Sequence, residues 1–388
     1  MKALKITIPG SKSLTNRAIL MASLSNGSSK IKNISNSLDS LIMIRAMKKL
    51  GIRIKVNKNE LKISGNRGVF QEFNGMIEAG QAGTVTRFLT ALSVLIPGQM
   101  TVKSTMAKDR PIKELGNALK KIRTGKVSIS GSISSQFISS LLMIAPVLEK
   151  GLIIKITGRL VSSSYIDMTI DLMKKFGIKV EKINNNKLKI KKQSYRSTDY
   201  VVESDLSGAS YFFAAAAVTG KPIRINNIEF DSVQGDLEFS NLLEKMGSRV
   251  RKNIRQKWIE VKGPKVLKGI NADMVNLPDT AQTLAVVAAF AKGKTKIIGL
   301  STLKIKETNR LQALKNELEA MKIKSEIKYD SIIITGGKPQ KTTIKTYGDH
   351  RMAMAFAVAK LRIPELKIKN PEVVKKSFPE FWEKFKKI

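Results

Sequence analysis

The sequence predicts a mixed α/β protein of two similar domains, each built from three repeated β-α-β-α-β-β units. Three observations support this prediction. Helix starts of one type recur about every 70 residues. Helices that end in glycine are followed by strand–turn–strand patterns, and 388 residues are enough for two separate cores. A fixed period of this kind is typical of a repeated supersecondary unit.

The six helix starts share a run of small or polar residues followed by an apolar run rich in Ala, Leu and Met. They begin near Ser11, Ala82, Ser134, Ser207, Asp279 and Asp349. The interval between the second and third is shorter, about 50 residues. Only residues 123–125 separate the predicted helix 112–122 from the next strand, so the second unit lacks one hairpin. We interpret this as a tolerated surface deletion.

The second recurring pattern is a helix followed directly by a β-hairpin, in most copies with a glycine at the end of the helix. Gly51 ends the first such helix, and strands at 52–56 and 61–63 flank an Asn-rich turn. Equivalent patterns follow Gly177 and Gly247, and a fourth follows the predicted helix 311–321. Glycine suits a helix C-cap and Asn suits a turn with positive φ, so each unit predicts a helix and then a β-hairpin.

Six units over this length predict a domain of residues 11–204 and a domain of residues 1–10 plus 205–388. The N-terminal strand, residues 4–8, precedes the first unit and is assigned to the second domain. A helix N-terminus carries unpaired backbone N–H groups and the positive end of the helix dipole. If both domains direct their helix starts at one cleft, these groups form an anion site there.

The composition, 42% hydrophobic and 26% charged, is that of a globular protein. No apolar run approaches the roughly 20 residues that span a bilayer, and no signal peptide precedes the first strand, so we expect a cytoplasmic protein. Without cysteine, disulfides and thiolate chemistry are excluded. A histidine-based zinc site or catalytic triad would depend on His350 alone. Catalysis is therefore expected from Asp, Glu, Lys, Arg and hydroxyl groups.

The formal net charge of +38 raises the question of a polyanionic partner. The lysines, however, are spread along the chain, with no basic tail and no basic stripe interleaved with aromatic residues. We interpret the charge as compositional drift and do not expect nucleic acid as the main partner. A positive field still attracts small anionic substrates.

Polar residues gather at the six helix starts and are candidate anion-binding groups. They are Lys12, Ser13, Arg17, Gly83, Thr84, Arg87, Ser134, Ser135, Gln136, Asp205, Ser207, Asp279, Asp349, His350 and Arg351. Arg110, Lys306, Glu307, Arg310 and Lys376 lie in three further segments, and the spacing of Lys306 and Arg310 predicts one helical face. Any one start alone is equally well explained as an ordinary cap, and Lys306 with Arg310 as a solvated face. Six starts in register favour a shared site.

Nine motifs in order along nearly the whole chain resemble the 5-enolpyruvylshikimate-3-phosphate synthase family. They are Pro-Gly-Ser-Lys-Ser-x-x-Asn-Arg-Ala at 9–18, Ala-Gly-Thr-x-x-Arg-Phe-Leu at 82–89, Asp-Arg-Pro at 109–111, Ser-Ser-Gln-Phe at 134–137, Tyr-Ile-Asp-x-Thr at 165–169, Pro-Asp at 278–279, Lys-Glu-Thr-x-Arg at 306–310, Asp-His-Arg-Met-Ala at 349–353 and Lys-x-Phe-Pro at 376–379. The resemblance implies two domains of three units with the active site in the cleft between them.

The resemblance also implies the reaction. The family, 3-phosphoshikimate 1-carboxyvinyltransferases, moves the enolpyruvyl group of phosphoenolpyruvate to the 5-hydroxyl of 3-phosphoshikimate and releases phosphate. This transferase step belongs to the shikimate pathway, which leads to chorismate and the aromatic amino acids. We therefore expect two small anionic substrates, no cofactor, no metal, no membrane and a monomer. Retention of Gly83 predicts inhibition by glyphosate, a phosphoenolpyruvate mimic.

Site residues carried over from the resemblance fall into three groups. The catalytic residues are Asp279, which takes the proton of the 5-hydroxyl, Glu307, which protonates the methylene carbon, and Lys12. Expected at phosphoenolpyruvate are Lys12, Gly83, Arg87, Arg110, Gln136, Arg310, Arg351 and Lys376. Expected at 3-phosphoshikimate are Ser13, Arg17, Ser134, Ser135, Gln136, Ser162, Tyr165, Asp279, Thr302 and Lys306.

The chain departs from the family pattern at several positions. Gln81 and Thr302 replace a frequent Asn, Asn309 replaces a usual Asp, and residues 163–164 replace a basic-Pro pair. Two alternatives stay open. One is the sister transferase that acts on UDP-N-acetylglucosamine, and the other is a non-catalytic polyanion-binding protein with the same fold.

Overall fold

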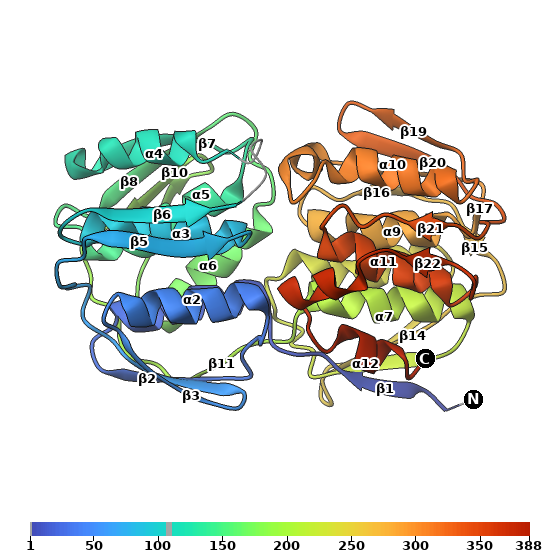
Figure 1. Ribbon diagram of the computed structural model, residues 1–388, viewed down its shortest axis with the longest axis horizontal. Coiled ribbons are helices and arrows are strands. Elements are labelled where there is room, and N and C mark those ends of the chain that lie inside the picture. Colours follow the sequence, from blue (N-terminus) through green and yellow to red (C-terminus); the bar gives the residue numbers. More distant parts are fainter. Residues whose placement is uncertain (1, 106–110) are drawn as a thin grey trace. The chain divides into compact units, whose positions relative to one another are not determined.

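The computed structural model describes residues 2–105 and 111–388, which divide into two compact units. Unit 1 consists of Met1–Pro9 and Glu203–Ile388, and unit 2 consists of Gly10–Val202. Figure 1 shows the helices and strands of both units. Each unit has its own hydrophobic core. The predicted mixed α/β class, built from repeated units, is confirmed.

Unit 2 has a core of helices with sheets packed around it. Its helices are α1 (Lys12–Leu24), α2 (Leu38–Lys49), α3 (Gly83–Leu92), α4 (Lys113–Lys120), α5 (Ser135–Ile144) and α6 (Ser164–Lys175). One sheet has the order β11 (Tyr200–Val201), β2 (Ser28–Lys32), β4 (Glu60–Ser64) and β3 (Arg53–Asn57). A second has the order β7 (Lys126–Ser130), β8 (Leu152–Thr157), β10 (Lys187–Ile190) and β9 (Glu181–Asn184). The strands β5 (Gly75–Gly80) and β6 (Met100–Ser104) form a parallel pair.

Unit 1 repeats this plan. Its helices are α7 (Leu206–Thr219), α8 (Phe239–Lys245), α9 (Ala281–Ala288), α10 (Arg310–Ala320), α11 (His350–Lys360) and α12 (Phe381–Phe385). One sheet has the order β1 (Leu4–Thr7), β12 (Ile223–Asn226), β14 (Trp258–Lys262) and β13 (Arg249–Asn253). A second has the order β16 (Asn271–Asp273), β18 (Lys294–Ile298), β20 (Ser331–Thr335) and β19 (Ser325–Lys328). Two short parallel pairs are β15 (Leu267–Lys268) with β17 (Ala291–Lys292) and β21 (Thr343–Ile344) with β22 (Lys367–Ile368).

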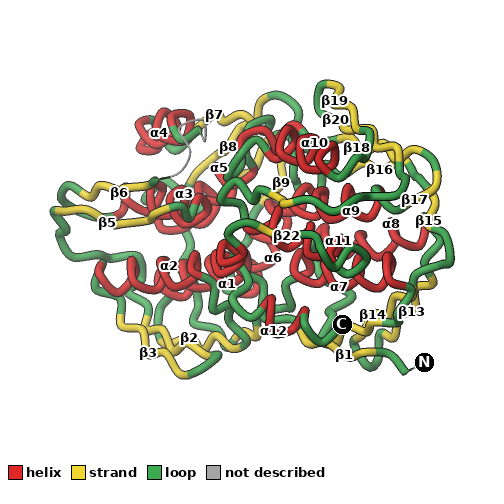
Figure 2. The backbone as a smooth tube through the Cα atoms, turned by 45° about the vertical axis from the view of Figure 1, so that its right-hand side comes forward, coloured by secondary structure: helices red, strands yellow, loops and turns green. Residues whose placement is uncertain are grey.

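Helices α7, α9 and α11 pack against one another at the centre of unit 1. Figure 2 shows the sheet of β1, β14 and β13 on one side of them and the sheet of β16, β18, β20 and β19 on the other. All three helices are almost entirely buried. Because the helices are packed inside the core, the polar side chains at their N-termini are held in fixed positions.

The four-stranded sheets of the described chain share one topology, a parallel pair followed by an antiparallel hairpin. The four predicted hairpins are confirmed as β3/β4, β9/β10, β13/β14 and β19/β20. Gly51, Gly177 and Gly247 have positive φ after their helices, as a C-cap glycine should. In the fourth copy Lys322 takes this place with a φ of 61°, which few residues other than glycine adopt.

Two edge strands are exchanged between the units, because each precedes the first helix of one unit in the sequence and pairs in a sheet of the other unit. The strand before α1, β1, pairs with β12 of unit 1, whereas the strand before α7, β11, pairs with β2 of unit 2. In the second repeat, residues 113–130 run from α4 through one 3-10 turn (Ile122–Thr124) directly into β7, with no hairpin between them. Gly125 makes the turn possible with a φ of 76°.

All six predicted helix starts are present. Side-chain oxygens of Ser11, Ser134, Asp205 and Asp349 accept a backbone N–H of the first turn of α1, α5, α7 and α11. A 3-10 turn containing Asp279 (Pro278–Thr280) precedes α9, and α3 begins at Gly83 without a side-chain cap. These capped starts are what brings the polar groups of each unit together.

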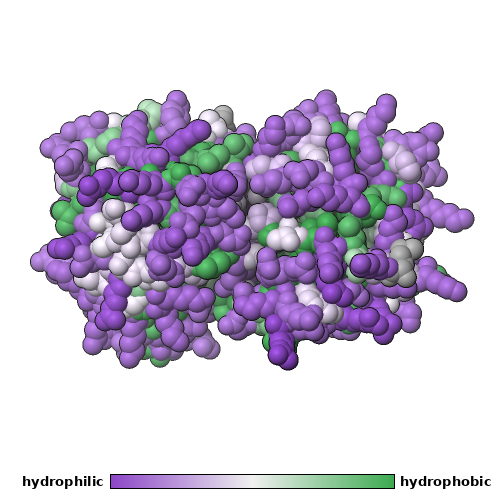
Figure 3. All heavy atoms as spheres, turned by 90° about the horizontal axis from the view of Figure 1, so that it is seen from below, coloured by the Kyte–Doolittle hydropathy of each residue, from purple (hydrophilic) through white to green (hydrophobic). Residues whose placement is uncertain are grey.

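Hydrophilic side chains cover most of the face seen in Figure 3. Among residues 2–105 and 111–388, the helices are too short or too polar to cross a membrane.

Candidate active site

The start of α1 places Lys12 in a buried ion pair. Ser11 accepts the backbone N–H of Leu14 at 3.5 Å, so Lys12 is the first helical residue. Its Nζ lies 2.9 Å from Oδ2 of Asp39, and 11% and 4% of the two side chains are exposed. Sequence reasoning missed Asp39. Its position in the first turn of α2, after the cap Ser37, was the available signal.

Arg17 is buried in unit 2 among uncharged partners. It donates from Nε to Thr169 Oγ1 at 2.8 Å and from Nη1 to the backbone oxygen of Ser13 at 2.9 Å. Nη2 donates at 3.3 Å to Ser139 Oγ and to the backbone oxygen of Tyr165. Burial lowers the pKa of Arg17 to about 10. The group remains a cation at neutral pH, with its charge solvated by hydroxyls and carbonyls.

Arg87 and Gln136 join the starts of α3 and α5. Arg87 Nη1 donates to Gln136 Oε1 at 2.5 Å, and Gln136 Nε2 donates to Thr84 Oγ1 at 3.1 Å. The Arg87 guanidinium also lies 5.2 Å from the ring centre of Phe137. These contacts fix one cation and one amide at the positions that the resemblance assigns to substrate binding.

The other predicted residues of unit 2 lie at the same helix starts. Ser134 caps α5, Ser135 is buried, and Ser162 precedes α6 with a φ of 54°. Ser13 and Tyr165 contact Arg17 through backbone oxygens, and Gly83 is the first residue of α3. Arg110 lies outside the described residues.

Arg310 is the centre of the polar cluster in unit 1. Its guanidinium donates from Nε to Asp349 Oδ2 at 2.7 Å, from Nη1 to Asp279 Oδ1 at 3.0 Å and from Nη2 to Glu307 Oε2 at 2.6 Å. Only 1% of the Arg310 side chain is exposed. Burial alone would lower the pKa of Arg310, but the three carboxylates outweigh burial and raise it. The guanidinium is therefore a permanent cation that orients three acids.

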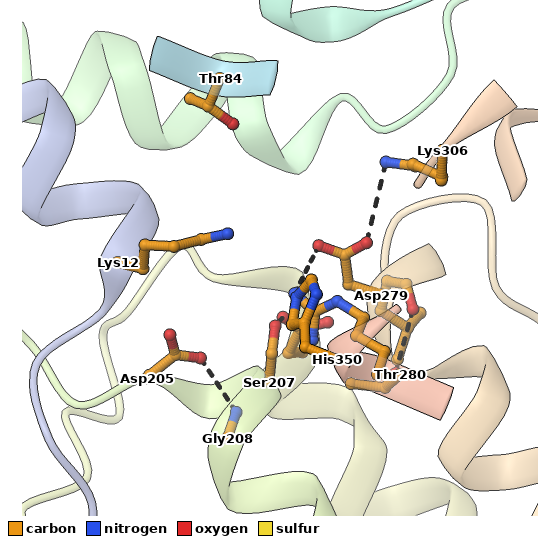
Figure 4. A network of polar contacts seen from close by, with 12 residues as sticks. Lys12, Thr84, Asp205, Ser207, Gly208, Asp279, Thr280, Lys306 and His350 are labelled. Carbon is orange, nitrogen blue, oxygen red and sulfur yellow. Dashed lines mark hydrogen bonds and ion pairs between the residues drawn. The ribbon is translucent and has the colours of Figure 1, made fainter. Parts of the chain in front are cut away.

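Asp279 is surrounded by positive charge. Besides Arg310, its carboxylate meets Arg351 Nη2 at 2.7 Å. It also lies 3.7 Å from Lys306 Nζ, a contact drawn in Figure 4. Burial alone would raise the pKa of Asp279, but Arg351, Lys306 and Arg310 hold it well below its ordinary value. With 15% of its side chain exposed, the ionised carboxylate is accessible to a substrate.

Glu307 lies between two cations. Its second oxygen, Oε1, is 3.5 Å from Lys376 Nζ. The prediction of one helical face for Lys306 and Arg310 is wrong, because α10 begins only at Arg310 and Lys306 follows a 3-10 turn (Ser301–Ile305). The bend still brings both cations to Asp279. The cluster thus combines cations that can bind a polyanion with carboxylates that can transfer protons.

Sequence reasoning missed a second acid beside this cluster, Asp236. It is buried, and its Oδ2 accepts the hydroxyl of Ser207 at the start of α7. Burial is the main cause that raises the pKa of Asp236 to about 7, and the charge of Asp279 adds to it. No sequence motif pointed to Asp236, which lies in a short 3-10 turn (Gly235–Glu238) before α8. Thr302 is also buried, and its hydroxyl has no hydrogen-bond partner among the described residues.

Solved structures share this fold across the full chain. An EPSP synthase from Acinetobacter baumannii superposes with a TM-score of 0.81 at 24% identity, covering 100% of this chain and 96% of that one. The enolpyruvyl transferase NikO from Streptomyces tendae gives a TM-score of 0.72 at 15% identity, covering 100% and 94%. The fold is thus that of the enolpyruvyl transferases.

Sequence comparison narrows this class to one family. The model of the EPSP synthase (3-phosphoshikimate 1-carboxyvinyltransferase) family matches residues 3–124 and 117–385. Relatives named 3-phosphoshikimate 1-carboxyvinyltransferase include one from Nostoc punctiforme, 37% identical over 98% of this chain and 95% of its own. Another, from Actinobacillus pleuropneumoniae, is 38% identical over 99% and 96%. The chain belongs to the EPSP synthase family.

Proposed function

We propose that this protein transfers the enolpyruvyl group of phosphoenolpyruvate to the 5-hydroxyl of 3-phosphoshikimate. The products are 5-enolpyruvylshikimate 3-phosphate and inorganic phosphate. Family membership supports this proposal, and the observation that carries it is the ionised Asp279 held by Arg310, Arg351 and Lys306. A carboxylate that stays ionised among cations can accept a proton from a hydroxyl beside a bound polyanion.

The proposed chemistry is addition followed by elimination. Asp279 takes the proton of the 5-hydroxyl while the oxygen of that hydroxyl bonds to C2 of phosphoenolpyruvate. At the same time Glu307 gives a proton to C3. In the tetrahedral intermediate the C2–O bond to phosphate then breaks, and C3 returns a proton to the Glu307 carboxylate, which restores the double bond between C2 and C3. The phosphate leaves with the electron pair of the broken C2–O bond, so atoms and charge balance.

In this proposal the cations of unit 1 also bind the anionic groups of the substrates. Arg310, Arg351 and Lys376 bind the phosphate and carboxylate of phosphoenolpyruvate, with Lys306 and Thr302 at 3-phosphoshikimate. In the structure these cations pair with Asp279 and Glu307. Substrate anions replace part of that pairing, so the cations remain neutralised.

For unit 2 we propose the roles that the family pattern assigns. Lys12, Gly83, Arg87, Arg110 and Gln136 contact phosphoenolpyruvate. The residues proposed at 3-phosphoshikimate are Ser13, Arg17, Ser134, Ser135, Gln136, Ser162 and Tyr165. The rigid partners of Arg17 and Arg87 support this assignment, because a preorganised cation binds an anion without ordering a long side chain.

The test is phosphate release from phosphoenolpyruvate in the presence of 3-phosphoshikimate. We expect release by the wild type, loss of about 100-fold or more in Asp279→Ala, and no loss in Asp231→Asn, an exposed acid of the same unit. Release only with UDP-N-acetylglucosamine would favour the sister transferase. Binding of both substrates without release would favour a non-catalytic polyanion-binding protein.

We also propose that the chain acts as a monomer in the cytoplasm. Two small, water-soluble anions as substrates require neither a membrane nor nucleic acid. Light scattering after size exclusion, and fractionation of cells with a tagged chain, test these two points.

A further inference from the structure

We propose that Tyr211 is a positioning residue for Arg351, and that its hydroxyl fixes the guanidinium that binds phosphoenolpyruvate. This inference rests on the function proposed above. None of the sequence motifs includes Tyr211. It lies in helix α7, whose aromatic and alanine-rich sequence is typical of a buried core helix.

The first support is the pair of contacts at the Arg351 guanidinium. Nη1 donates to the hydroxyl of Tyr211 at 3.3 Å, and Nη2 donates to Asp279 Oδ2 at 2.7 Å. Tyr211 is completely buried and Arg351 nearly so. Asp279 must meet the 5-hydroxyl during turnover, so its contact with Arg351 is exchanged. The contact with Tyr211 involves no reacting atom and can persist throughout.

The second support is the way the ring of Tyr211 is held. It packs edge-on against Phe381, with ring centres 5.8 Å apart and an interplanar angle of 80°. Phe381 also contacts Phe378 and Phe385 in the C-terminal segment. Edge-to-face packing of this kind fixes ring orientation. The C-terminal aromatic cluster therefore fixes the position of the Tyr211 hydroxyl, and this hydroxyl fixes the orientation of the Arg351 guanidinium.

The third support is the charge state of the hydroxyl. Burial raises the pKa of Tyr211 to about 12, although Arg351 opposes that shift. The phenol stays neutral at all pH values at which the enzyme is expected to work. It orients the guanidinium without cancelling the positive charge that the substrate needs.

The experiment is steady-state kinetics of Tyr211→Phe, which removes the hydroxyl and keeps the ring. We expect the KM for phosphoenolpyruvate to rise about 3- to 10-fold, the loss typical of one ordinary hydrogen bond. The KM for 3-phosphoshikimate and kcat should stay within about 2-fold, because the substitution keeps the positive charge of Arg351 beside Asp279 and loosens only the guanidinium proposed to bind phosphoenolpyruvate.

Tyr195→Phe is the matched control. Tyr195 is a buried tyrosine of unit 2 whose hydroxyl donates to the backbone oxygen of Met143 at 2.8 Å. Its loss should lower the melting temperature without changing the KM for phosphoenolpyruvate. If Tyr211→Phe behaves like Tyr195→Phe, or raises both KM values equally, Tyr211 has a structural role only and the proposal is wrong.

Failure of the proposed function is seen separately, as absence of phosphate release by the wild type. The melting temperature measured with added phosphoenolpyruvate then tests the positioning role. A smaller upward shift for Tyr211→Phe than for wild type supports it, and equal shifts overturn it.

Discussion

Arg310 and Asp349 form a fully buried ion pair, with 2.7 Å between Nε and Oδ2 and exposures of 1% and 0%. Asp349 also caps α11 by accepting the backbone N–H of Arg351 at 2.8 Å. One carboxylate therefore contacts the guanidinium of Arg310 and the backbone of Arg351. The position of the Arg310 side chain is thus tied to the start of the helix that carries Arg351.

Asp349→Ala should strongly destabilise unit 1. It removes one partner of a buried pair and a helix cap together, for which about 3–5 kcal/mol is expected. Urea denaturation measures the change. Glu319→Ala is the control, because it breaks an exposed pair with Lys315 and should cost less than about 1 kcal/mol. Equal losses in the two variants would show that burial of the pair is unimportant.

Asp236 should make stability fall as pH rises. Its pKa is raised from 3.8 to about 7 in the folded chain, so the folded state binds this proton more tightly than the unfolded state. The stabilisation is full below about pH 4 and is lost as pH rises through about 7, by up to about 4 kcal/mol. Asp236→Asn lacks this titration, so it should be the more stable protein at pH 8. Parallel stability curves for wild type and Asp236→Asn from pH 5 to 8 would contradict this.

Lys12→Met should nearly abolish turnover. It should also cost stability, because Asp39 is left buried with no cation at 2.9 Å. The double variant Lys12→Met with Asp39→Asn separates the two effects. We expect it to regain most of the melting temperature and none of the phosphate release. Recovery of activity together with stability would assign Lys12 a structural role.

Glyphosate should inhibit the enzyme in competition with phosphoenolpyruvate. Its carboxylate and phosphonate match the anionic groups that Arg310, Arg351 and Lys376 are proposed to bind, and Gly83 is retained at the start of α3. Initial rates at several concentrations of both compounds test this. Turnover that glyphosate leaves unchanged, or inhibition that excess phosphoenolpyruvate does not relieve, would count against the assignment.

The repeated architecture could be predicted because its signals are local. Caps such as Ser11 and Ser134 and turns such as Gly51 act within a few residues, so each helix start and hairpin is visible in a short stretch of sequence. Lys322 shows the limit of this signal. A lysine occupies the positive-φ position there, and only the surrounding pattern marked the end of the helix.

The partners of the site residues could not be predicted, because they come from distant parts of the chain. Arg17 bonds to Thr169, and Arg310 to Asp349, through contacts that only the packed helices create. Asp236 lies in a short 3-10 turn and Tyr211 in an apolar helix, so neither has a local sequence pattern that distinguishes a functional residue from one that only packs. The spacing of Lys306 and Arg310 was misleading, since a bend rather than a helix connects them.

The exchange of β1 and β11 has a consequence for the order of events during synthesis. All of unit 2, residues 10–202, leaves the ribosome before β12 (Ile223–Asn226), the partner of β1, exists. At about 5–20 residues per second, β1 waits on the order of 10–40 s while about 200 further residues are made. The first strand to emerge is thus paired only after every strand of unit 2 has been made, and unit 2 can fold completely while that strand is still without its sheet.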